Sequence, residues 1–331
     1  MRAAAIRAAV VCAATLAGIG CGGRLDAGHD RPRGLLPVDD RNPVVIVQDD
    51  WSGDWLGELA VLYASSGRLT VAEVVVNSTR YWMDLDANTT GWMNLMAAAR
   101  ASGLKNLPPI TRSVGPPLTR PANNQIDSTV ANHSDGAERI VARSRELSQP
   151  FRPLVVVTGT SLTEVADAYL VDPTVTERVV VVSALGVYKA PNGELGTPNG
   201  DLDSWAAWIV SQRFQFIQIG TYYDQTTDVT AEKVSSLPPN QLGTFMARKQ
   251  AKILPDLTAC DQVALLSVAL PDFVDSVVRV SLDVSAGFEE MKPPTLVPDD
   301  KGDDWVVTKI KGPKAGTELW QMLYDSHTFG P

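Results

Sequence analysis

The residues best suited to chemistry are carboxylates that follow the first apolar run of the chain. After Val44 to Val47 and Gln48 come Asp49 and Asp50, and Asp54 follows four residues later. Clustered carboxylates at the end of a strand favour a hard-cation site, because Ca²⁺ takes several oxygen ligands at once. A structural role is equally open, in which Asp54 caps the next helix and Asp50 accepts hydrogen bonds from loop amides.

Three further polar residues precede or open predicted helices. Thr163 follows the apolar run Leu154 to Val157, Asn199 lies in the turn-rich Pro-Asn-Gly stretch, and Asp261 precedes an apolar segment. Thr163 and Asn199 each have a structural alternative, since Thr is common near helix starts and Asn is common in turns. For Asp203 we prefer the role of helix N-cap.

The elements that must position these residues alternate along the chain. Unbroken Val- and Ile-rich runs predict strands buried on both faces, and the segments between them have helical patterns. The predicted strands are Val44 to Val47, Val71 to Val76, Leu154 to Val157, Val179 to Val182 and Phe214 to Ile219. The predicted helices are Trp55 to Ala64, Thr89 to Ala101, Ser134 to Glu146, Leu162 to Leu170 and Ser204 to Gln212. This order predicts a doubly wound α/β fold with a mostly parallel sheet flanked by helices, in which ligands bind beyond the carboxyl ends of the strands.

The C-terminal part carries weaker signals. The acidic, Pro-rich stretch from Lys292 to Asp304 is interpreted as a surface connection. A strand is predicted over Trp305 to Ile310 and a closing helix over Glu318 to Tyr324.

The spacing of the polar residues resembles that of the inosine/uridine-preferring, calcium-dependent nucleoside hydrolases. The family pattern DxDxxxDD falls on Gln48, Asp50, Asp54 and Trp55. The run Leu154 to Ala166, with Thr163, is similar to the family's strand and TGPLTN-like turn, and Asp172-Pro173 follows in the family's order. The family's EFNxxxDPxAA and HDxxA segments fall on Thr197, Asn199 and Asp203, and on Cys260 and Asp261.

This resemblance implies a set of roles. Asp50, the Thr163 carbonyl and Asp261 would hold Ca²⁺, and Asp50 would also activate the attacking water. Asp54 and Asn199 would hold the ribose hydroxyls. The products would be ribose and a free base.

Several positions depart from the family pattern. Gln48, Trp55, Thr197 and Cys260 replace an Asp, an Asp, a Glu and a His, and Ala184-Leu185-Gly186 retains only the last glycine of the family's Met-Gly-Gly turn. Asp49 or Glu58 would be the replacement for the calcium ligand lost at Trp55. Two alternatives therefore stay open: an envelope protein that binds a nucleoside or sugar with altered or impaired catalysis, and a metal-free carbohydrate hydrolase that uses Asp50 and Asp54 as its carboxylate pair.

The N-terminal segment has the layout of an export signal. Residues 1–20 combine Arg2 and Arg7 with an apolar, acid-free run that is too short to span a membrane. The segment ending in Gly20-Cys21 is similar to a bacterial lipoprotein processing site, so either lipidation of Cys21 or simple cleavage is expected. We predict a flexible tether over residues 21–42, the folded domain over 43–331, and a location in the periplasm or cell envelope.

The charge of the chain disfavours one class of partner. The sequence has 29 basic and 38 acidic residues, and loss of Arg2 and Arg7 with the signal would make the net charge about −11. Nucleic acid is therefore not expected as a partner, since its phosphates would be repelled. The expected partner is a small-molecule nucleoside or sugar, membrane contact is expected only through a lipid on Cys21, and the oligomeric state is left open.

Overall fold

The computed structural model of the chain describes residues 31–49, 55–184, 198–219, 236–250, 261–285, 287–289 and 295–324. The described residues from Pro32 onward belong to one compact unit, which extends over Pro32–Pro331. No helix in these ranges is long and apolar enough to cross a membrane.

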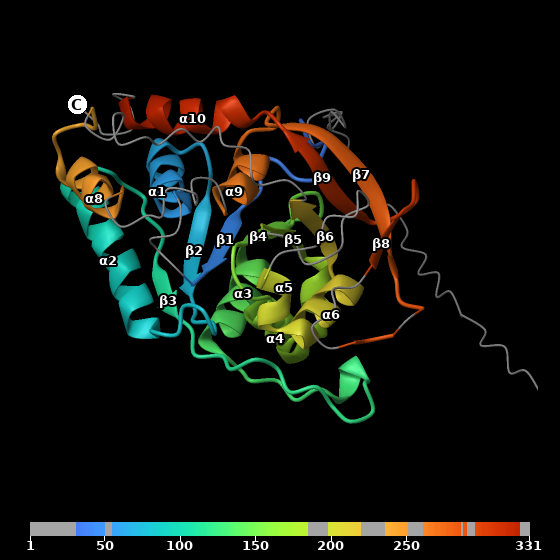
Figure 1. Cartoon of the computed structure of the whole chain (residues 1–331). Coiled ribbons are helices and arrows are strands. Elements are labelled where there is room, and N and C mark those ends of the chain that lie inside the picture. Colours follow the sequence, from blue (N-terminus) through green and yellow to red (C-terminus); the bar gives the residue numbers. More distant parts are fainter. Residues whose placement is uncertain are drawn as a thin grey trace, which may run out of the picture. The chain divides into compact units, whose positions relative to one another are not determined.

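A single sheet of nine strands organises this unit (Figure 1). Its spatial order is β3-β2-β1-β4-β5-β6-β9-β7-β8. The pairs from β3 through β6 to β9 are parallel, whereas β7 runs antiparallel to β9 and β8. The strands are β1 Val44–Gln48, β2 Val71–Val76, β3 Ile110–Arg112, β4 Leu154–Thr158, β5 Val179–Ser183, β6 Gln215–Ile219, β7 Val274–Asp283, β8 Thr295–Pro298 and β9 Asp304–Ile310. The mostly parallel α/β sheet predicted from the sequence is thereby confirmed.

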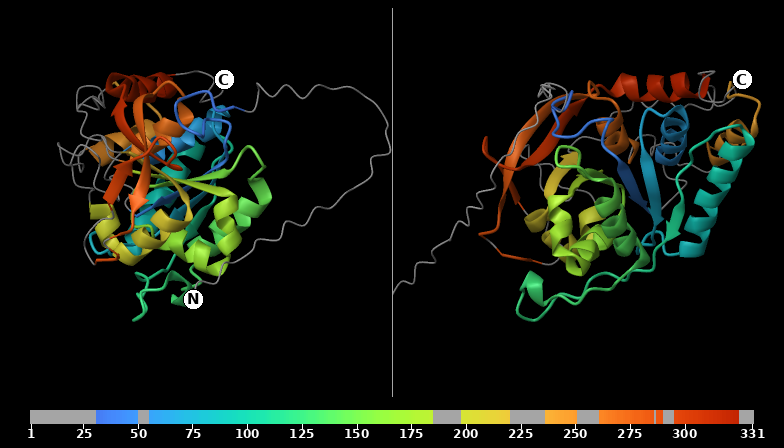
Figure 2. Two further views of the ribbon diagram at one scale, coloured as in Figure 1. Left: turned by 90° about the vertical axis from the view of Figure 1, so that its right-hand side faces the viewer. Right: turned by 180° about the vertical axis from the view of Figure 1, so that it is seen from behind.

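Helices cover both faces of the sheet, as Figures 1 and 2 show. The helices are α1 Leu56–Ser66, α2 Leu85–Ala101, α3 Asp135–Leu147, α4 Thr163–Val171, α5 Pro198–Leu202, α6 Ser204–Arg213, α8 Gln241–Gln250, α9 Gln262–Ala269 and α10 Gly312–Tyr324. Short 3₁₀ helices span Ile126–Ser128 and Pro173–Glu177.

Alternate strand residues enter two different cores. Val44 and Ile46 of β1 join the core formed with α1, α2, α8, α9 and α10. Val45 and Val47 join the core formed with α3, α4 and α6. Because successive side chains of a strand point to opposite faces, a run of four valines and isoleucines fills both cores at once.

The C-terminal stretch differs from the prediction. The segment Lys292 to Asp304, interpreted as a surface connection, contains β8, which pairs with β7 through Val297 and Ser281. Strand β7 is only partly buried and carries Asp275 and Arg279, so it lacks the apolar run that marks the parallel strands. The antiparallel extension of the sheet therefore gave no clear signal in the sequence.

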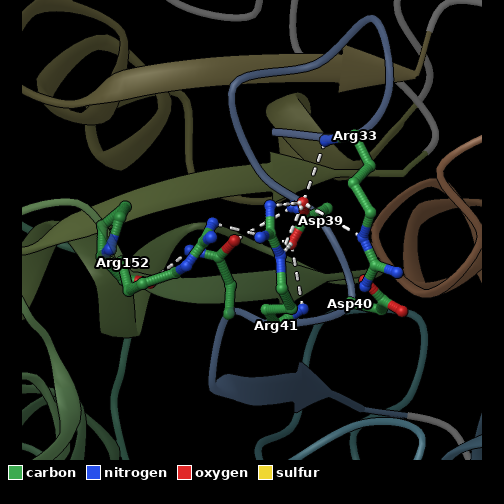
Figure 3. A network of polar contacts seen from close by, with 7 residues as sticks. Arg33, Asp39, Asp40, Arg41 and Arg152 are labelled. Carbon is green, nitrogen blue, oxygen red and sulfur yellow. Dashed lines mark hydrogen bonds and ion pairs between the residues drawn. The ribbon is translucent and has the colours of Figure 1, made fainter. Parts of the chain in front are cut away.

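The packed domain also begins earlier than residue 43. Leu36 and Val38 are buried, and the Asn42 amide donates to the Pro153 carbonyl at 2.8 Å. Within this segment the buried Asp39 lies at the centre of the polar contacts drawn in Figure 3. Its carboxylate accepts hydrogen bonds from the backbone N–H of Arg33 at 3.0 Å and from the guanidinium of Arg41 at 2.6 Å.

This network holds Asp39 in its charged form. Burial alone would raise the pKa of Asp39, but the hydrogen bonds from Arg41 and Arg33 outweigh it and lower the pKa below its usual value. The Arg152 guanidinium lies 3.8 Å from the same carboxylate. Part of the predicted tether is thus a docked strap at the amino ends of β1 and β4, while the predicted signal and Cys21 lie outside the described residues.

Candidate functional site

Buried polar residues mark the carboxyl ends of four neighbouring strands. Gln48 ends β1, Asn77 follows β2, Thr158 ends β4 and Ser183 ends β5, and all four are buried. The order β2-β1-β4-β5 places these ends side by side. Burial of so many polar groups at one edge is unusual for a core and typical of a ligand site in an open α/β sheet.

The ends of β1 and β4 meet Asp261 at the start of α9. The Gln48 amide Nε2 donates to Asp261 Oδ2 at 2.5 Å, and both side chains are buried. Gly159 lies against this pair, because a Cβ at that position would overlap the carboxylate of Asp261 and Oε1 of Gln48. Glycine is therefore required here for close approach and not for an unusual backbone angle.

Asn77 connects three of the strand ends. Its backbone N–H donates to the Gln48 carbonyl at 3.2 Å, and its side-chain Oδ1 accepts from the Thr160 hydroxyl at 3.3 Å. Its amide nitrogen donates to Oε2 of the fully buried Glu164 at 2.8 Å. Burial raises the pKa of Glu164 to about 7, against the hydrogen bond from Asn77 that favours the charged form.

A second cluster of polar side chains lies at the start of α6. Asp203 is the N-cap of α6 and accepts from the Ala206 N–H at 3.0 Å, which confirms the predicted capping role. Its other oxygen accepts from the Thr163 hydroxyl at 2.9 Å and from the Leu118 N–H at 2.8 Å. Burial raises the pKa of Asp203, although these hydrogen bonds oppose the shift.

Asn199 and a surface hollow lie in the same region. Asn199 is buried, and its amide donates to the Ala184 carbonyl just past β5 at 3.3 Å. A hollow of about 260 Å³ opens beside Asp203. Its lining includes Arg80, Arg120, Asp201, Trp205 and Phe288.

The acids proposed to replace the ligand lost at Trp55 are both engaged by protein donors. Asp49 Oδ2 accepts from the Thr79 hydroxyl at 2.7 Å. Glu58 accepts from the Lys249 ammonium at 2.8 and 3.0 Å, and this ion pair is buried. Lys249 also lies 5.0 Å from the centre of the Trp55 ring.

Some of the predicted site residues fall within the described ranges, and others do not. Asn199 lies beside the residue that follows β5, Thr163 is the first residue of α4 and contacts Asp203, and Asp261 lies against Gln48 at the end of β1. Asp50 and Asp54 lie outside the described residues, as do Leu185, Gly186, Thr197 and Cys260.

The described residues fit a calcium ion poorly. Asp261, one of the expected ligands, already accepts the Gln48 amide, and Gln48 brings no negative charge. Within the described ranges, no three His, Cys, Asp or Glu side chains come together as a metal-binding group. The Gln48 side chain turns its amide nitrogen, and not its oxygen, toward the carboxylate of Asp261. The buried Oε1 of Gln48 accepts no hydrogen bond from the described residues.

Some residues of this site were not found from the sequence. Asn77 carries no recognisable motif, and only its position just after β2 marks it. Thr160 and Glu164 lie within the run that resembles the family's turn, but the sequence assigned them no role. Lys249 gives even less signal, since it lies in an ordinary helical pattern 191 residues from its partner Glu58.

Comparison with known proteins agrees with this architecture at the level of structure. No family model and no curated protein sequence matches the chain. Among solved structures, a purine-preferring ribonucleoside hydrolase from Gardnerella vaginalis is similar with a TM-score of 0.58 and 14% identity, over 87% of this chain and 100% of its own.

Two further structures share the fold. An inosine-guanosine nucleoside hydrolase has a TM-score of 0.58 and 14% identity, over 85% of this chain and 98% of its own. A nucleoside hydrolase-related protein from Saccharophagus degradans, described as associated with carbohydrate metabolism, has a TM-score of 0.54 and 12% identity, over 87% of this chain and 72% of its own. This chain therefore has the nucleoside hydrolase fold.

Proposed function

We propose that the protein binds a ribonucleoside at the carboxyl ends of β1, β4 and β5 and hydrolyses its N-glycosidic bond to ribose and a free base. The observation that carries this proposal is the row of buried polar residues at the ends of β1, β4 and β5, where Gln48 contacts Asp261 and Asn199 contacts the Ala184 carbonyl. The similar solved structures are named as hydrolases of nucleosides, which supports the same substrate class here.

The proposed chemistry assigns the reacting roles to the loop after β1. Asp50, two residues beyond the end of β1, would take a proton from the attacking water, since a positioned carboxylate is a suitable general base. Asp54 and Asn199 would hold the ribose hydroxyls. Glycoside hydrolysis passes through an oxocarbenium-like sugar, so carboxylates close to the ring also stabilise the positive charge that develops.

A binding protein is the second candidate, and the Gln48–Asp261 pair favours it. An amide in place of a carboxylate at the edge of the site removes negative charge from the place where the sugar becomes positive. Trp55, Thr197 and Cys260 are further departures from the hydrolase pattern. A metal-free carbohydrate hydrolase using Asp50 and Asp54 is a third candidate, which accepts glycosides that carry no nucleobase.

We propose further that the protein is exported to the periplasm or cell envelope, with residues 1–20 removed and either a free or a lipid-bearing Cys21. Mass spectrometry of protein purified from membranes and from the periplasm tests this. A mass that retains residues 1–20 in both fractions contradicts export.

Turnover of a nucleoside panel tests the enzymatic proposal. Purified protein is incubated with inosine, uridine, adenosine and cytidine while reducing sugar is followed, beside Asp50→Asn and Asn199→Ala. Asp50→Asn should lower kcat by at least about 10²-fold, whereas Asn199→Ala should act more on KM. Binding of a nucleoside in calorimetry, without turnover, would support the second candidate. Release of sugar from simple glycosides but from no nucleoside would support the third candidate.

A further inference from the structure

The geometry points to a metal-independent site, in which the side-chain amide of Gln48 binds Asp261 in the place of a cation. This inference rests on the proposed function only for the identity of the substrate, because metal binding is measured without turnover.

The Gln48–Asp261 contact leaves no room for an ion between its two polar atoms. Nε2 and Oδ2 are 2.5 Å apart. Ca²⁺ keeps its oxygen ligands 2.3–2.6 Å from the ion, which separates neighbouring ligand oxygens by about 3 Å or more. An ion at this position would therefore have to push the two side chains apart.

The main chain around Gln48 cannot move to make room for an ion. Gln48 pairs with Val76 in the parallel ladder, and its carbonyl accepts the Asn77 N–H at 3.2 Å. On the other side the pair lies directly against Gly159, where even one added methyl group would overlap both side chains. The main chain on both sides of the contact is thus fixed by strands β1, β2 and β4, so an ion could enter only if the two side chains turned apart. The neutral amide of Gln48 brings no negative charge to favour that movement, whereas a carboxylate at position 48 would be repelled by Asp261 and would attract the ion.

Glu58, one of the acids expected to replace the ligand lost at Trp55, is paired with a cation of the protein itself. It is engaged by the buried Lys249 ammonium, so it is not available as a replacement ligand. Lys249 also approaches the ring of Trp55, the residue that stands where the family pattern has an acid. A buried cation beside Trp55 and Glu58 disfavours a second, divalent cation in the same place, because like charges repel strongly where water is excluded.

The amide also offers a group that a metal-binding carboxylate lacks. Gln48 donates through Nε2, while its buried Oε1 accepts no hydrogen bond from the described residues. Buried polar oxygens normally have a donor, and a substrate hydroxyl or a water molecule would supply one. Gln48 would then contact the sugar through its oxygen while holding Asp261 through its nitrogen.

Calcium binding by the purified protein tests the inference. The protein is treated with EDTA, dialysed and titrated with CaCl₂ by calorimetry, and its melting temperature is measured with and without the ion. We expect no binding heat and an unchanged Tm up to millimolar calcium. A tight site would raise Tm by about 4 °C at a calcium concentration about 100 times its Kd, and such a rise would overturn the inference.

A pair of variants locates the effect at Gln48. Gln48→Glu has the same shape but places a carboxylate against Asp261, so it should be less stable than wild type in EDTA and should regain Tm on calcium addition. Gln48→Met removes the donor without adding charge and should melt at the same temperature with and without calcium. If Gln48→Glu folds, as judged by circular dichroism, and does not respond to calcium, the assigned role of Gln48 is wrong. If it does not fold, the wild-type titration decides.

Discussion

Removal of the Lys249 ammonium should strongly destabilise the protein. Lys249→Met keeps the aliphatic stem of the side chain and leaves Glu58 buried without its cation. The two groups are both less than 2% exposed, and the ammonium lies 2.8 and 3.0 Å from the two carboxylate oxygens. Water therefore cannot take the place of the lost partner.

The expected loss follows from this burial. Breaking a buried ion pair by removing one partner costs about 3–5 kcal/mol, because the remaining buried charge has lost its counter-ion. Unfolding entropy near 2.1 cal/mol/K per residue gives roughly 0.6 kcal/mol/K for a domain of about 300 residues. The predicted fall in Tm is therefore about 5–8 °C.

A double-mutant cycle with Glu58→Gln measures the interaction itself. Urea unfolding of wild type, both single variants and the double variant gives the coupling free energy. Lys249→Met combined with Glu58→Gln should recover most of the loss, because no buried charge is left. A single-variant loss below about 1 kcal/mol, or a double variant whose loss equals the sum of the two single losses, would refute the reasoning.

Three further predictions concern other parts of the fold. Gly159→Ala should lower the free energy of unfolding by about 1–3 kcal/mol and weaken nucleoside binding, because its methyl group overlaps Asp261 and Gln48. Thermal unfolding measures the first effect and calorimetry the second, and an unchanged Tm would contradict the close packing at Gly159. Burial raises the pKa of Asp304 to about 7, so the folded state holds a proton that the unfolded state releases from about pH 4 upward. Stability should therefore fall as pH rises toward 7, and Asp304→Asn should flatten this dependence, while an identical pH profile would exclude it. The lowered pKa of Asp39 has the opposite sign, so its contribution is present at neutral pH and is lost on acidification. Removal of residues 32–42 should lower Tm by several degrees and remove that acid-dependent contribution, and an unchanged Tm would show that the strap contributes nothing to stability.

The parallel half of the fold could be predicted because its strands are unbroken apolar runs. Val71–Val76 and Val179–Ser183 match the predicted strands to within a residue, since burial on both faces leaves little room for polar side chains. The short edge strand β3 and the partly buried β7 lack that pattern. Their pairing depends on partners distant in the chain, which a local pattern does not contain.

The candidate site was predictable to the extent that it follows strand ends. Thr163, Asn199 and Asp261 were found by the spacing of a family pattern and lie beside the sheet edge. The partner of each acid was not predictable, because Gln48 and Asp261 are 213 residues apart and Glu58 and Lys249 are 191 residues apart. These pairs decide whether the carboxylates of Asp261 and Glu58 are available to a metal ion. The expectation that they hold calcium therefore depends on contacts that no local pattern encodes.

The most direct test of the account is ribose release from nucleosides by the EDTA-treated protein. Hydrolysis at a metal-independent site should give release that persists in the chelator, is not increased by added calcium, and is lost in Asp50→Asn. Release that appears only with calcium would contradict the metal-independent site. No release from any nucleoside by the folded protein, in either condition, would contradict the hydrolase proposal itself.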